Sequence, residues 1–364
     1  MTVVHTPAPS LPPPTSEIGV LGWLKHNLFS NWYNSVLSVL AIYLIYLVVP
    51  PVITWAIIDS NVLGSSKDDC TGGGACWVLV THRWQQFLYG FYPAEERWRV
   101  NLGIFLGFAA LFWVLAEGTP WKKYVTLFLC LGYPFVAFFL FAGGYFGLVE
   151  VETNKWGGLY LTLVISGVGI STSLPIGIVL ALGRRSDMPV IRMLCVGFIE
   201  FIRAVPLITI LFMAAIMLPL FLPPGTNFNL LVRVLIGVSL FSAAYMAEVV
   251  RAGLQAIPRG QYEGAQALGL NYWKMMGLII LPQALKISIP NIVSSFIGLF
   301  KDTTLVLIIG LYDLLNITQL AVTDGKWLGL ANEGYFFAGA TFWVFCFGMS
   351  RYSVYLEHKL HTGH

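Results

Sequence analysis

Charged side chains are scarce in this sequence of 364 residues. Asp, Glu, Lys and Arg together make up 11%, whereas about 25% is usual in a soluble globular domain. The residue types A, V, I, L, M, F, W, Y and C make up 57%, and they fall in long uninterrupted runs. The composition therefore excludes a soluble protein and predicts an integral membrane protein. The net charge of +3 is too small and too dispersed to favour nucleic-acid binding.

The sequence also lacks the motifs of nucleotide-binding and hydrolytic sites. It contains no GxxxxGKS/T loop, no HExxH, no GxSxG and no Cys and His residues at zinc-ligand spacing, and none of its apolar runs holds a histidine. We predict that the chain is not an enzyme and holds neither metal nor cofactor. His358, His361 and His364 are interpreted as part of a solvated tail rather than as metal ligands, because no matching ligands occur elsewhere.

Eight runs are long enough to cross a membrane as helices, which takes about 20 apolar residues each. They are residues 36–58, 100–117, 124–149, 158–183, 190–222, 231–251, 288–311 and 336–356. The sequence thus predicts an all-α integral membrane protein with about eight transmembrane helices. The run 190–222 contains Pro206 and Pro219 and is expected to kink.

The distribution of basic residues predicts the orientation of the chain. With the N-terminus inside, the cytoplasmic loops hold twice as many Lys and Arg residues as the outer loops, as the positive-inside rule requires. Both termini are therefore expected in the cytoplasm. The Pro-rich stretch PAPSLPPPTS at residues 7–16 does not have the pattern of a signal peptide. Residues 1–35 are predicted to be a disordered tail plus an interfacial segment.

Two polar interruptions are longer than simple turns, namely residues 59–99 outside and 252–287 inside. In the outer loop, Cys70 and Cys76 flank three glycines. An oxidising exterior would permit a disulfide between them, with free thiols as the alternative. The other cysteines lie singly inside spans and are interpreted as apolar packing.

The inner loop has the pattern of a short helical hairpin. Residues 261–268 predict a first helix, which Gly269 can end by adopting a positive φ. Asn271 is a suitable cap for a second helix over 272–280, which Pro282 is expected to close. Such a hairpin is suited to docking into a groove of another protein, and an ordinary surface hairpin is the alternative.

This loop resembles the EAA loop of ABC-importer permeases, in which E-A-A is followed after three residues by G and after nine more by I-x-L-P. The matching residues are Glu263, Gly264, Ala265, Gly269, Ile279, Leu281 and Pro282, with Gly264 in place of the usual alanine. Three further stretches resemble signatures of the polar amino-acid (histidine, glutamine and arginine) permeases. They are Glu200–Leu207 with Arg203 and Pro206, Ala244–Gly253 with Glu248 and Arg251, and Lys301–Leu305.

These signatures cover about residues 155–360, which contain the last five spans. Gly74–Trp77 and the Tyr92, Pro93 and Arg97–Arg99 cluster resemble the extended general L-amino-acid transporter branch. The resemblance implies a type I ABC-importer permease core over 151–364. A three-helix extension over 36–150 would precede it.

The resemblance also implies partners. Permeases of this kind work with ABC ATPase subunits that carry ATP and Mg²⁺. They also work with a second permease subunit, here expected to form a heterodimer, and with an extracytoplasmic solute-binding protein that delivers an L-amino acid. The expected location is the bacterial inner membrane. The expected function is the permease subunit of an ATP-driven amino-acid importer.

Three groups of candidate functional residues follow. The coupling residues toward the ATPase are Glu263, Gly264, Ala265, Gly269, Leu281 and Pro282. The charged residues inside spans, which could line or gate the path, are Glu200, Arg203, Glu248, Lys301 and Asp302. The candidates for substrate contact are Ser166, Thr172, Ser242, Tyr245, Ser294, Ser295 and Thr303.

Each of the last two groups has a structural alternative. The intramembrane charges could form a salt-bridge network that holds the core, with Glu200–Arg203 and Glu248–Lys301 as the plausible pairs. The Ser and Thr hydroxyls could bond their own helix backbone. Two other functions also remain open, namely an ion-coupled secondary amino-acid transporter and a membrane scaffold or receptor subunit without a pore.

Overall fold

The computed structural model describes residues 19–145, 147–223 and 229–360. The Pro-rich stretch at 7–16, and His361 and His364 of the predicted tail, lie outside these residues. The chain divides into two compact units, one that runs through Val78 and one that begins at Leu79.

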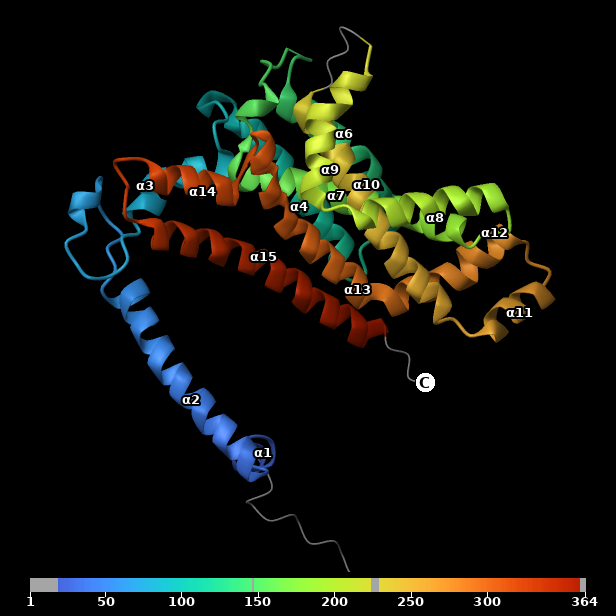
Figure 1. Cartoon of the computed structure of the whole chain (residues 1–364), viewed down its shortest axis with the longest axis horizontal. Helices are drawn as coiled ribbons and strands as arrows, with labels where there is room; N and C mark the ends of the chain where they lie inside the picture. The colour runs from blue at the N-terminus through green and yellow to red at the C-terminus, as the bar shows by residue number, and fades with distance from the viewer. Residues whose placement is uncertain (1–18, 146, 224–228, 361–364) are drawn as a thin grey trace, which may run out of the picture. The chain divides into compact units, whose positions relative to one another are not determined.

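The first unit is built around one long apolar helix. Helix α1 (Gly19–Asn27) precedes α2 (Trp32–Ile53), which a π-turn, Thr54–Ile58, extends (Figure 1). None of the residues of α2 is buried, although the helix is apolar on every side. A helix of this kind is suited to a lipid environment, and α2 with its π-turn corresponds to the predicted span 36–58.

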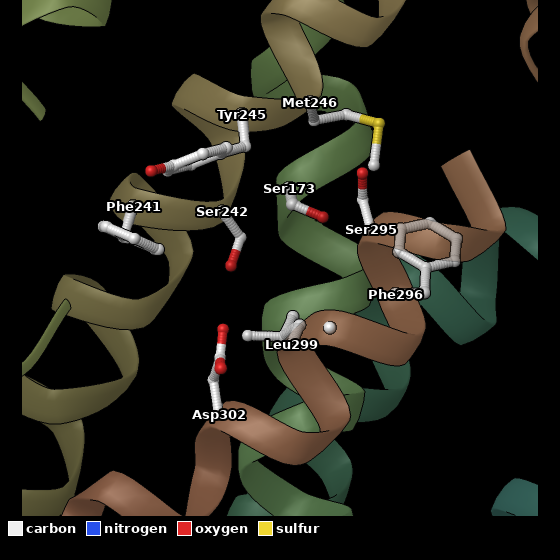
Figure 2. A pocket seen from close by; sticks show the side chains of 10 residues that line it. Ser173, Phe241, Ser242, Tyr245, Met246, Ser295, Phe296, Leu299 and Asp302 are labelled. Atoms are coloured by element: carbon white, nitrogen blue, oxygen red, sulfur yellow. The ribbon is translucent and has the colours of Figure 1, made fainter. Parts of the chain in front are cut away.

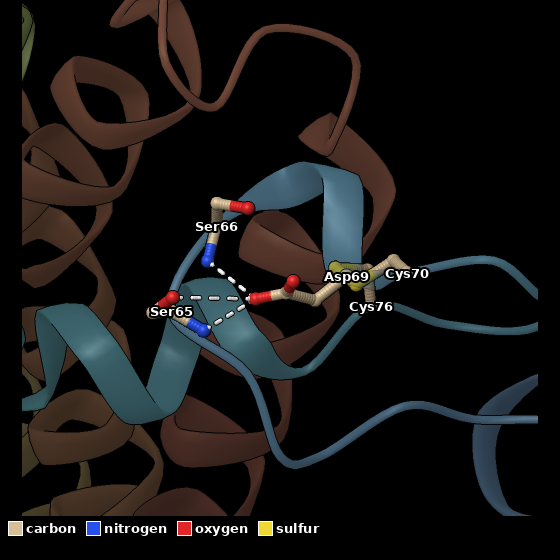
Figure 3. The surroundings of a disulfide bond; sticks show 5 residues. All are labelled: Ser65, Ser66, Asp69, Cys70 and Cys76. Atoms are coloured by element: carbon tan, nitrogen blue, oxygen red, sulfur yellow. Dashed lines mark hydrogen bonds between the residues drawn. A yellow bond between two sulfur atoms is a disulfide. The ribbon is translucent and has the colours of Figure 1, made fainter.

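The loop that follows α2 contains the cysteine pair. A disulfide joins Cys70 and Cys76, whose Cα atoms lie 5.7 Å apart (Figure 3). Beside it, the Asp69 carboxylate accepts hydrogen bonds from the backbone N–H groups of Ser65 (2.7 Å) and Ser66 (2.9 Å). These bonds favour the charged form and lower the pKa of Asp69. The short loop is therefore held both covalently and by a capped turn.

The second unit is almost entirely helical (Figure 1). Its first helices are α3 (Val78–Tyr89), α4 (Arg97–Leu115), α5 (Lys122–Leu127), α6 (Tyr133–Ala142), α7 (Gly158–Arg184), α8 (Pro189–Ala204) and α9 (Leu207–Phe212). The remaining elements are α10 (Leu230–Gln255), α11 (Arg259–Ala267), α12 (Tyr272–Met275), α13 (Leu281–Asp302), β1 (Tyr312–Asp313), α14 (Leu314–Thr323) and α15 (Ala331–Leu360).

Helices α7, α10 and α13 pack against one another at the centre of this unit. Glycines allow the close approach. A Cβ atom at Gly253 on α10 would lie 2.6 Å from the carbonyl oxygen of Ala284 on α13, and one at Gly177 on α7 would lie 2.8 Å from the Cβ of Met246. Small residues let membrane helices approach closely, which explains why the stretch Ala244–Gly253 ends in glycine.

The part of the predicted extension that lies in this unit packs against the predicted core, since the Phe141 ring of α6 lies edge-on to the Tyr160 ring of α7 (ring centres 5.1 Å apart). Further contacts hold the extension itself together. Arg99 at the start of α4 is fully buried, forms a salt bridge with Glu96 (3.0 Å) and donates to the carbonyl oxygen of Val149 (3.0 Å). The Tyr92 hydroxyl donates to the carbonyl oxygen of Phe141 at the end of α6 (2.7 Å). A buried arginine needs such partners, so these contacts fix how α4 and α6 join the polypeptide that leads into α7.

The predicted fifth span, 190–222, is interrupted rather than merely kinked. Helix α8 ends at Ala204, and a second helical stretch, Leu207–Phe221, begins after Pro206 at an angle of 104° to it. Proline cannot donate the backbone hydrogen bond that would continue the helix, and its ring clashes with the preceding turn. The sequence thus indicated the position of the break, while its angle depends on packing against α7 and α10.

The predicted number of eight spans is not confirmed. Within the described residues, six helices are long and apolar enough to cross a membrane, or seven if the bent pair is counted as one span. Helix α15 contains the predicted eighth span and has 30 residues. It does not belong to those six.

Pro282 does not close a helix as predicted. The chain continues from α12 through a π-turn, Met276–Ile280, directly into α13. Pro282 is the second residue of α13 and directly follows the π-turn, so its missing N–H falls where the regular α-helical hydrogen-bond pattern is already interrupted. The helical stretch Tyr272–Ile309 therefore has 38 residues. That length exceeds the roughly 20 residues that cross the hydrocarbon layer, so one end must lie outside it.

Candidate functional site

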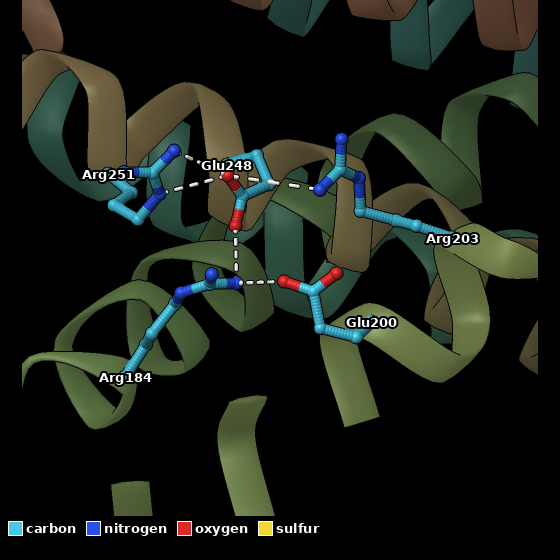
Figure 4. A network of polar contacts seen from close by, with 5 residues as sticks. All are labelled: Arg184, Glu200, Arg203, Glu248 and Arg251. Carbon is cyan, nitrogen blue, oxygen red and sulfur yellow. Dashed lines mark hydrogen bonds and ion pairs between the residues drawn. The ribbon is translucent and has the colours of Figure 1, made fainter. Parts of the chain in front are cut away.

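Five charged side chains meet where the ends of three helices come together (Figure 4). Arg184 is the last residue of α7, Glu200 and Arg203 lie on α8, and Glu248 and Arg251 lie on α10. Arg184 donates to both Glu200 (2.9 Å) and Glu248 (2.7 Å). Arg251 also donates to Glu248 (2.9 Å), and Arg203 is 3.8 Å from it. We call these five residues the arginine–glutamate cluster.

Glu248 is the centre of this cluster. Its side chain is 15% exposed and faces three arginines, whereas that of Glu200 is 55% exposed and pairs with Arg184. Two carboxylates thus compensate three guanidinium groups. Because partly buried charges need partners, the cluster ties the ends of α7, α8 and α10 together.

The two ion pairs proposed from the sequence are wrong. Glu200 pairs with Arg184 rather than Arg203, and Glu248 pairs with three arginines rather than with Lys301. Lys301 has no salt bridge with any described residue. A spacing of i, i+3 permits a contact along one helix, but here α7 supplies a nearer cation for Glu200.

A cavity of about 280 Å³ lies between α7, α10 and α13 (Figure 2). Its lining residues are Ser173 on α7, Phe241, Ser242, Tyr245 and Met246 on α10, and Ser295, Phe296, Gly298, Leu299 and Asp302 on α13. The side chains of Ser242 and Asp302 point toward each other across it. The guanidinium group of Arg203 lies over the Tyr245 ring, 5.5 Å from its centre, which connects the cavity to the arginine–glutamate cluster.

Three of the seven predicted contact residues line this cavity, namely Ser242, Tyr245 and Ser295. Four do not. Ser166 and Thr303 are buried and donate to the backbone of their own helical segments (2.7 and 2.9 Å). Thr172 donates to the Val168 carbonyl oxygen (2.7 Å), and its hydroxyl lies within hydrogen-bond distance of the Ser239 hydroxyl (2.8 Å). Ser294 is exposed. For Ser166 and Thr303, the structure thus shows the alternative interpretation, in which the hydroxyl bonds the backbone of its own helix.

Several residues of these sites were not predicted as functional from the sequence. Arg251 was named only within a signature stretch, and Arg184, Ser173 and the apolar lining residues were not singled out. The spacing of the lining residues on α13 indicates that they share one face of the helix. Residues 295, 298, 299 and 302 follow the i, i+3, i+4, i+7 pattern of one helix face. This pattern does not reveal which face meets another helix, so it could not identify the cavity.

The predicted inner hairpin is present as α11, a turn at Gly269, and α12. Gly269 has φ +70°, and the Asn271 side chain accepts a hydrogen bond from the Lys274 N–H (3.0 Å). Ala265 is 2% exposed and packs with Met275 and Ala284 in the protein's own core. Ala265 therefore does not lie on an outward docking surface, contrary to the prediction. The periodicity of α11 turns Ala265 inward, while Glu263 and Gly264 are exposed.

The outward face of the hairpin carries large apolar side chains instead. Leu268 is 77% exposed and Trp273 is 73% exposed. Tyr272 packs edge-on against Trp273, with ring centres 5.3 Å apart. Of the other predicted coupling residues, Leu281 is half-buried and Pro282 is exposed. We call Leu268, Tyr272 and Trp273 the apolar tip of the hairpin.

The described residues contain no group of three or more His, Cys, Asp or Glu side chains that could hold a metal ion. Cys130, Cys195 and Cys346 are free thiols, each half-buried.

The chain matches a known protein family. A family model described as binding-protein-dependent transport system inner membrane component matches residues 173–362. The chain belongs to this family. A relative, the inner membrane amino-acid ABC transporter permease protein YhdY of Escherichia coli (strain K12), is 50% identical over 366 residues, covering 100% of this chain and 99% of YhdY.

A second relative is the glutamate/glutamine/aspartate/asparagine transport system permease protein BztC of Rhodobacter capsulatus. It is 42% identical, over 97% of this chain and 96% of BztC. Among solved structures, one of an amino acid ABC transporter with histidines matches 56% of this chain and 92% of that chain, at 28% identity and a TM-score of 0.49.

Membership of this permease family confirms the resemblance inferred from the sequence. The relatives extend over nearly the whole chain, so they share the N-terminal extension as well as the core. The chain is thus an ABC transporter permease of the extended kind and a transport subunit rather than an enzyme. Nothing in these relatives supports an ion-coupled transporter.

Proposed function

We propose that this permease forms half of the translocation path of an ATP-driven L-amino-acid importer in the bacterial inner membrane. Its partners would be two ATPase subunits that bind ATP and Mg²⁺, a second and related permease chain, and an extracytoplasmic solute-binding protein. The names of the relatives YhdY and BztC support amino acids as the substrate class. The excess of basic residues in the inner loops supports cytoplasmic termini.

The observation that carries this proposal is the hairpin α11–Gly269–α12. It lies at one end of the 38-residue helical stretch Tyr272–Ile309, which is too long for its whole length to lie in the hydrocarbon layer. Its inner side packs on α10 and α13 through Ala265 and Met275, and its apolar tip is exposed. Exposed apolar side chains on a polar loop indicate a protein interface, and in this permease family an ATPase subunit is the partner that supplies energy.

Trp273→Ala is expected to weaken the ATPase complex. Buried tryptophans at interfaces contribute roughly 2 kcal/mol or more, which corresponds to about a 30-fold higher Kd. The measurement is the affinity between the purified permease complex and its cognate ATPase subunit. Trp121→Ala is the matched control, because Trp121 is 70% exposed but lies between α4 and α5, away from the hairpin. Equal affinities for the Trp273 variant and the wild type would refute docking at the tip.

The cavity lined by Asp302 is proposed as part of the translocation path. An amino-acid zwitterion carries an ammonium group, for which a carboxylate and neighbouring hydroxyls are suitable partners. Asp302 provides the carboxylate, and Ser242 and Ser295 provide the hydroxyls. The cationic arginine–glutamate cluster, reached through Arg203 above Tyr245, is proposed as a gate near this path.

Asp302→Asn is expected to lower uptake by about 10- to 100-fold, because a hydrogen bond to a charged group contributes roughly 1.5–3 kcal/mol. The measurement is ATP-driven uptake of radiolabelled L-glutamine by the complete complex in proteoliposomes. Ser294→Ala is the control, since Ser294 lies on the same helix but away from the cavity. If the Asn variant took up L-glutamine at the wild-type rate, Asp302 would not be part of the translocation path. Uptake driven by an ion gradient without ATP would instead favour a secondary transporter.

A further inference from the structure

Two consecutive arginines at the end of α7 contact different parts of the molecule. Arg184 belongs to the arginine–glutamate cluster and thereby contacts α8 and α10. Arg185 turns to the hairpin instead. Its Nη1 atom donates to the Tyr262 hydroxyl of α11 (3.2 Å) and to the carbonyl oxygen of Leu254 (3.3 Å), and its guanidinium carbon lies 5.7 Å from the centre of the Tyr262 ring.

Tyr262, Arg185 and the Leu254 carbonyl oxygen are all hydrogen-bonded to one another. The Tyr262 hydroxyl accepts from Arg185 and donates to the same Leu254 carbonyl oxygen (3.2 Å). Leu254 lies near the end of α10, and Tyr262 is half-buried on α11. One tyrosine therefore joins the hairpin to both α7 and α10.

The backbone alone does not fix the direction of α11. Helix α10 ends at Gln255, and Pro258, immediately before α11, has an extended conformation (φ −58°, ψ 142°). Because the helical hydrogen bonds are interrupted there, α11 could pivot at Pro258 without disturbing α10. The Arg185–Tyr262 contact helps to hold the angle, together with the burial of Ala265 in the core and a hydrogen bond from Gln283 on α13 to Gln261 on α11 (3.1 Å).

The end of α7 is in turn closely packed on α8. A Cβ atom at Gly183 would overlap the Sγ atom of Cys195 on α8. Since α7 is one helix of 27 residues from Gly158 to Arg184, a shift of its end is transmitted along its length and to its neighbours.

We infer that Arg185 and Tyr262 are positioning residues that convert a displacement of the hairpin into movement of α7 and, through Arg184, of the arginine–glutamate cluster. This role rests on the proposed function, because it assumes that an ATPase moves the hairpin. It is separate from docking, since the exposed Arg185 side chain and the half-buried Tyr262 bond to each other and to the Leu254 carbonyl oxygen of the permease body, whereas Leu268 and Trp273 of the apolar tip are 77% and 73% exposed. Loss of the contact should therefore uncouple ATP hydrolysis from transport without releasing the ATPase.

The test compares Arg185→Ala, Tyr262→Phe and the control Arg192→Ala in the complete reconstituted complex. Arg192 is an exposed arginine on α8 without a salt bridge among the described residues. Two quantities are measured, namely the ATPase retained on the purified permease and the ATP hydrolysed per radiolabelled L-glutamine transported. Tyr262→Phe keeps the ring beneath the guanidinium group and removes both hydroxyl hydrogen bonds, so it is the milder change.

Arg185→Ala is expected to retain the ATPase and to raise the ATP consumed per transported substrate several-fold, because hydrolysis would then proceed without moving α7. Tyr262→Phe should raise it less, and Arg192→Ala should not change it. An unchanged ratio in Arg185→Ala would overturn the inference, and so would loss of the ATPase, because the contact would then serve assembly. If the wild-type chain itself bound no ATPase and showed no ATP-driven uptake, the proposed function would fail instead.

Discussion

Replacing Gly269 by aspartate is expected to release the ATPase from the permease and to abolish ATP-driven uptake. Gly269 lies at the turn of the hairpin with φ +70°, and a Cβ atom there would meet no other atom of the chain. The substitution therefore causes no clash within the permease, and aspartate adopts a positive φ more readily than most residues, with more strain than glycine. In the complex, however, it would place a carboxylate beside Leu268 and the rest of the apolar tip, where the partner excludes water.

An unpaired charge buried at an interface costs roughly 3–5 kcal/mol, which is about a 100-fold or greater increase in Kd. The measurement is the amount of ATPase that co-purifies with tagged permease, together with uptake by the same preparation. Gly269→Asn is the matched control, because asparagine has the shape of aspartate and tolerates a positive φ about as well, but is neutral. Full retention of the ATPase by the Asp variant would show that the turn lies outside the interface.

Glu248→Gln is the second change with a large expected effect. Glutamine keeps the size of the side chain but removes the charge that Arg184, Arg203 and Arg251 share. Breaking a buried ion pair costs about 3–5 kcal/mol. Because the arginine side chains here are 23–36% exposed, solvent screening should reduce this to roughly 2–3 kcal/mol. We expect a lower melting temperature of the purified complex and loss of most uptake.

Glu200→Gln provides the control for Glu248. Both residues pair with Arg184, but Glu200 is 55% exposed and has that single salt bridge among the described residues. Pairs of this kind contribute about 0–1 kcal/mol, so melting temperature and uptake should stay near the wild-type values. Equal effects of the two substitutions would mean that Glu248 is not the centre of the cluster. An unchanged melting temperature with lost uptake in Glu248→Gln would favour a gate over a purely structural role.

The hairpin α11–Gly269–α12 was predictable from the sequence because its signals are local. Gly269 adopts the positive φ that its position required, and Asn271 caps α12 as expected. The break at Pro206 is local as well, since proline cannot donate a backbone hydrogen bond. In contrast, Pro282 was misread as a helix end. A preceding π-turn, Met276–Ile280, leads directly into α13, and the sequence pattern does not indicate this π-turn.

Partners between helices were not predictable in the same way. Glu200 has a cation three residues away on its own helix, yet it pairs with Arg184 from α7. Ala265 belongs to a motif that suggests an exposed surface, yet it lies in the core. Which side of a helix faces another helix depends on the packing of the whole bundle, and small shifts in helix rotation exchange one neighbour for another.

The sequence by itself determined that this protein lies in a membrane, that its inner loop forms a helical hairpin, and that it resembles ABC-importer permeases. Each of these follows from composition, from local backbone preferences, or from ordered motifs. Only the tertiary structure decided that Glu248 is shared by three arginines and that Asp302 faces Ser242 across a cavity. It also decided that Arg184 and Arg185 contact different elements. These contacts join residues distant in the chain, so they depend on how the helices pack rather than on any single segment.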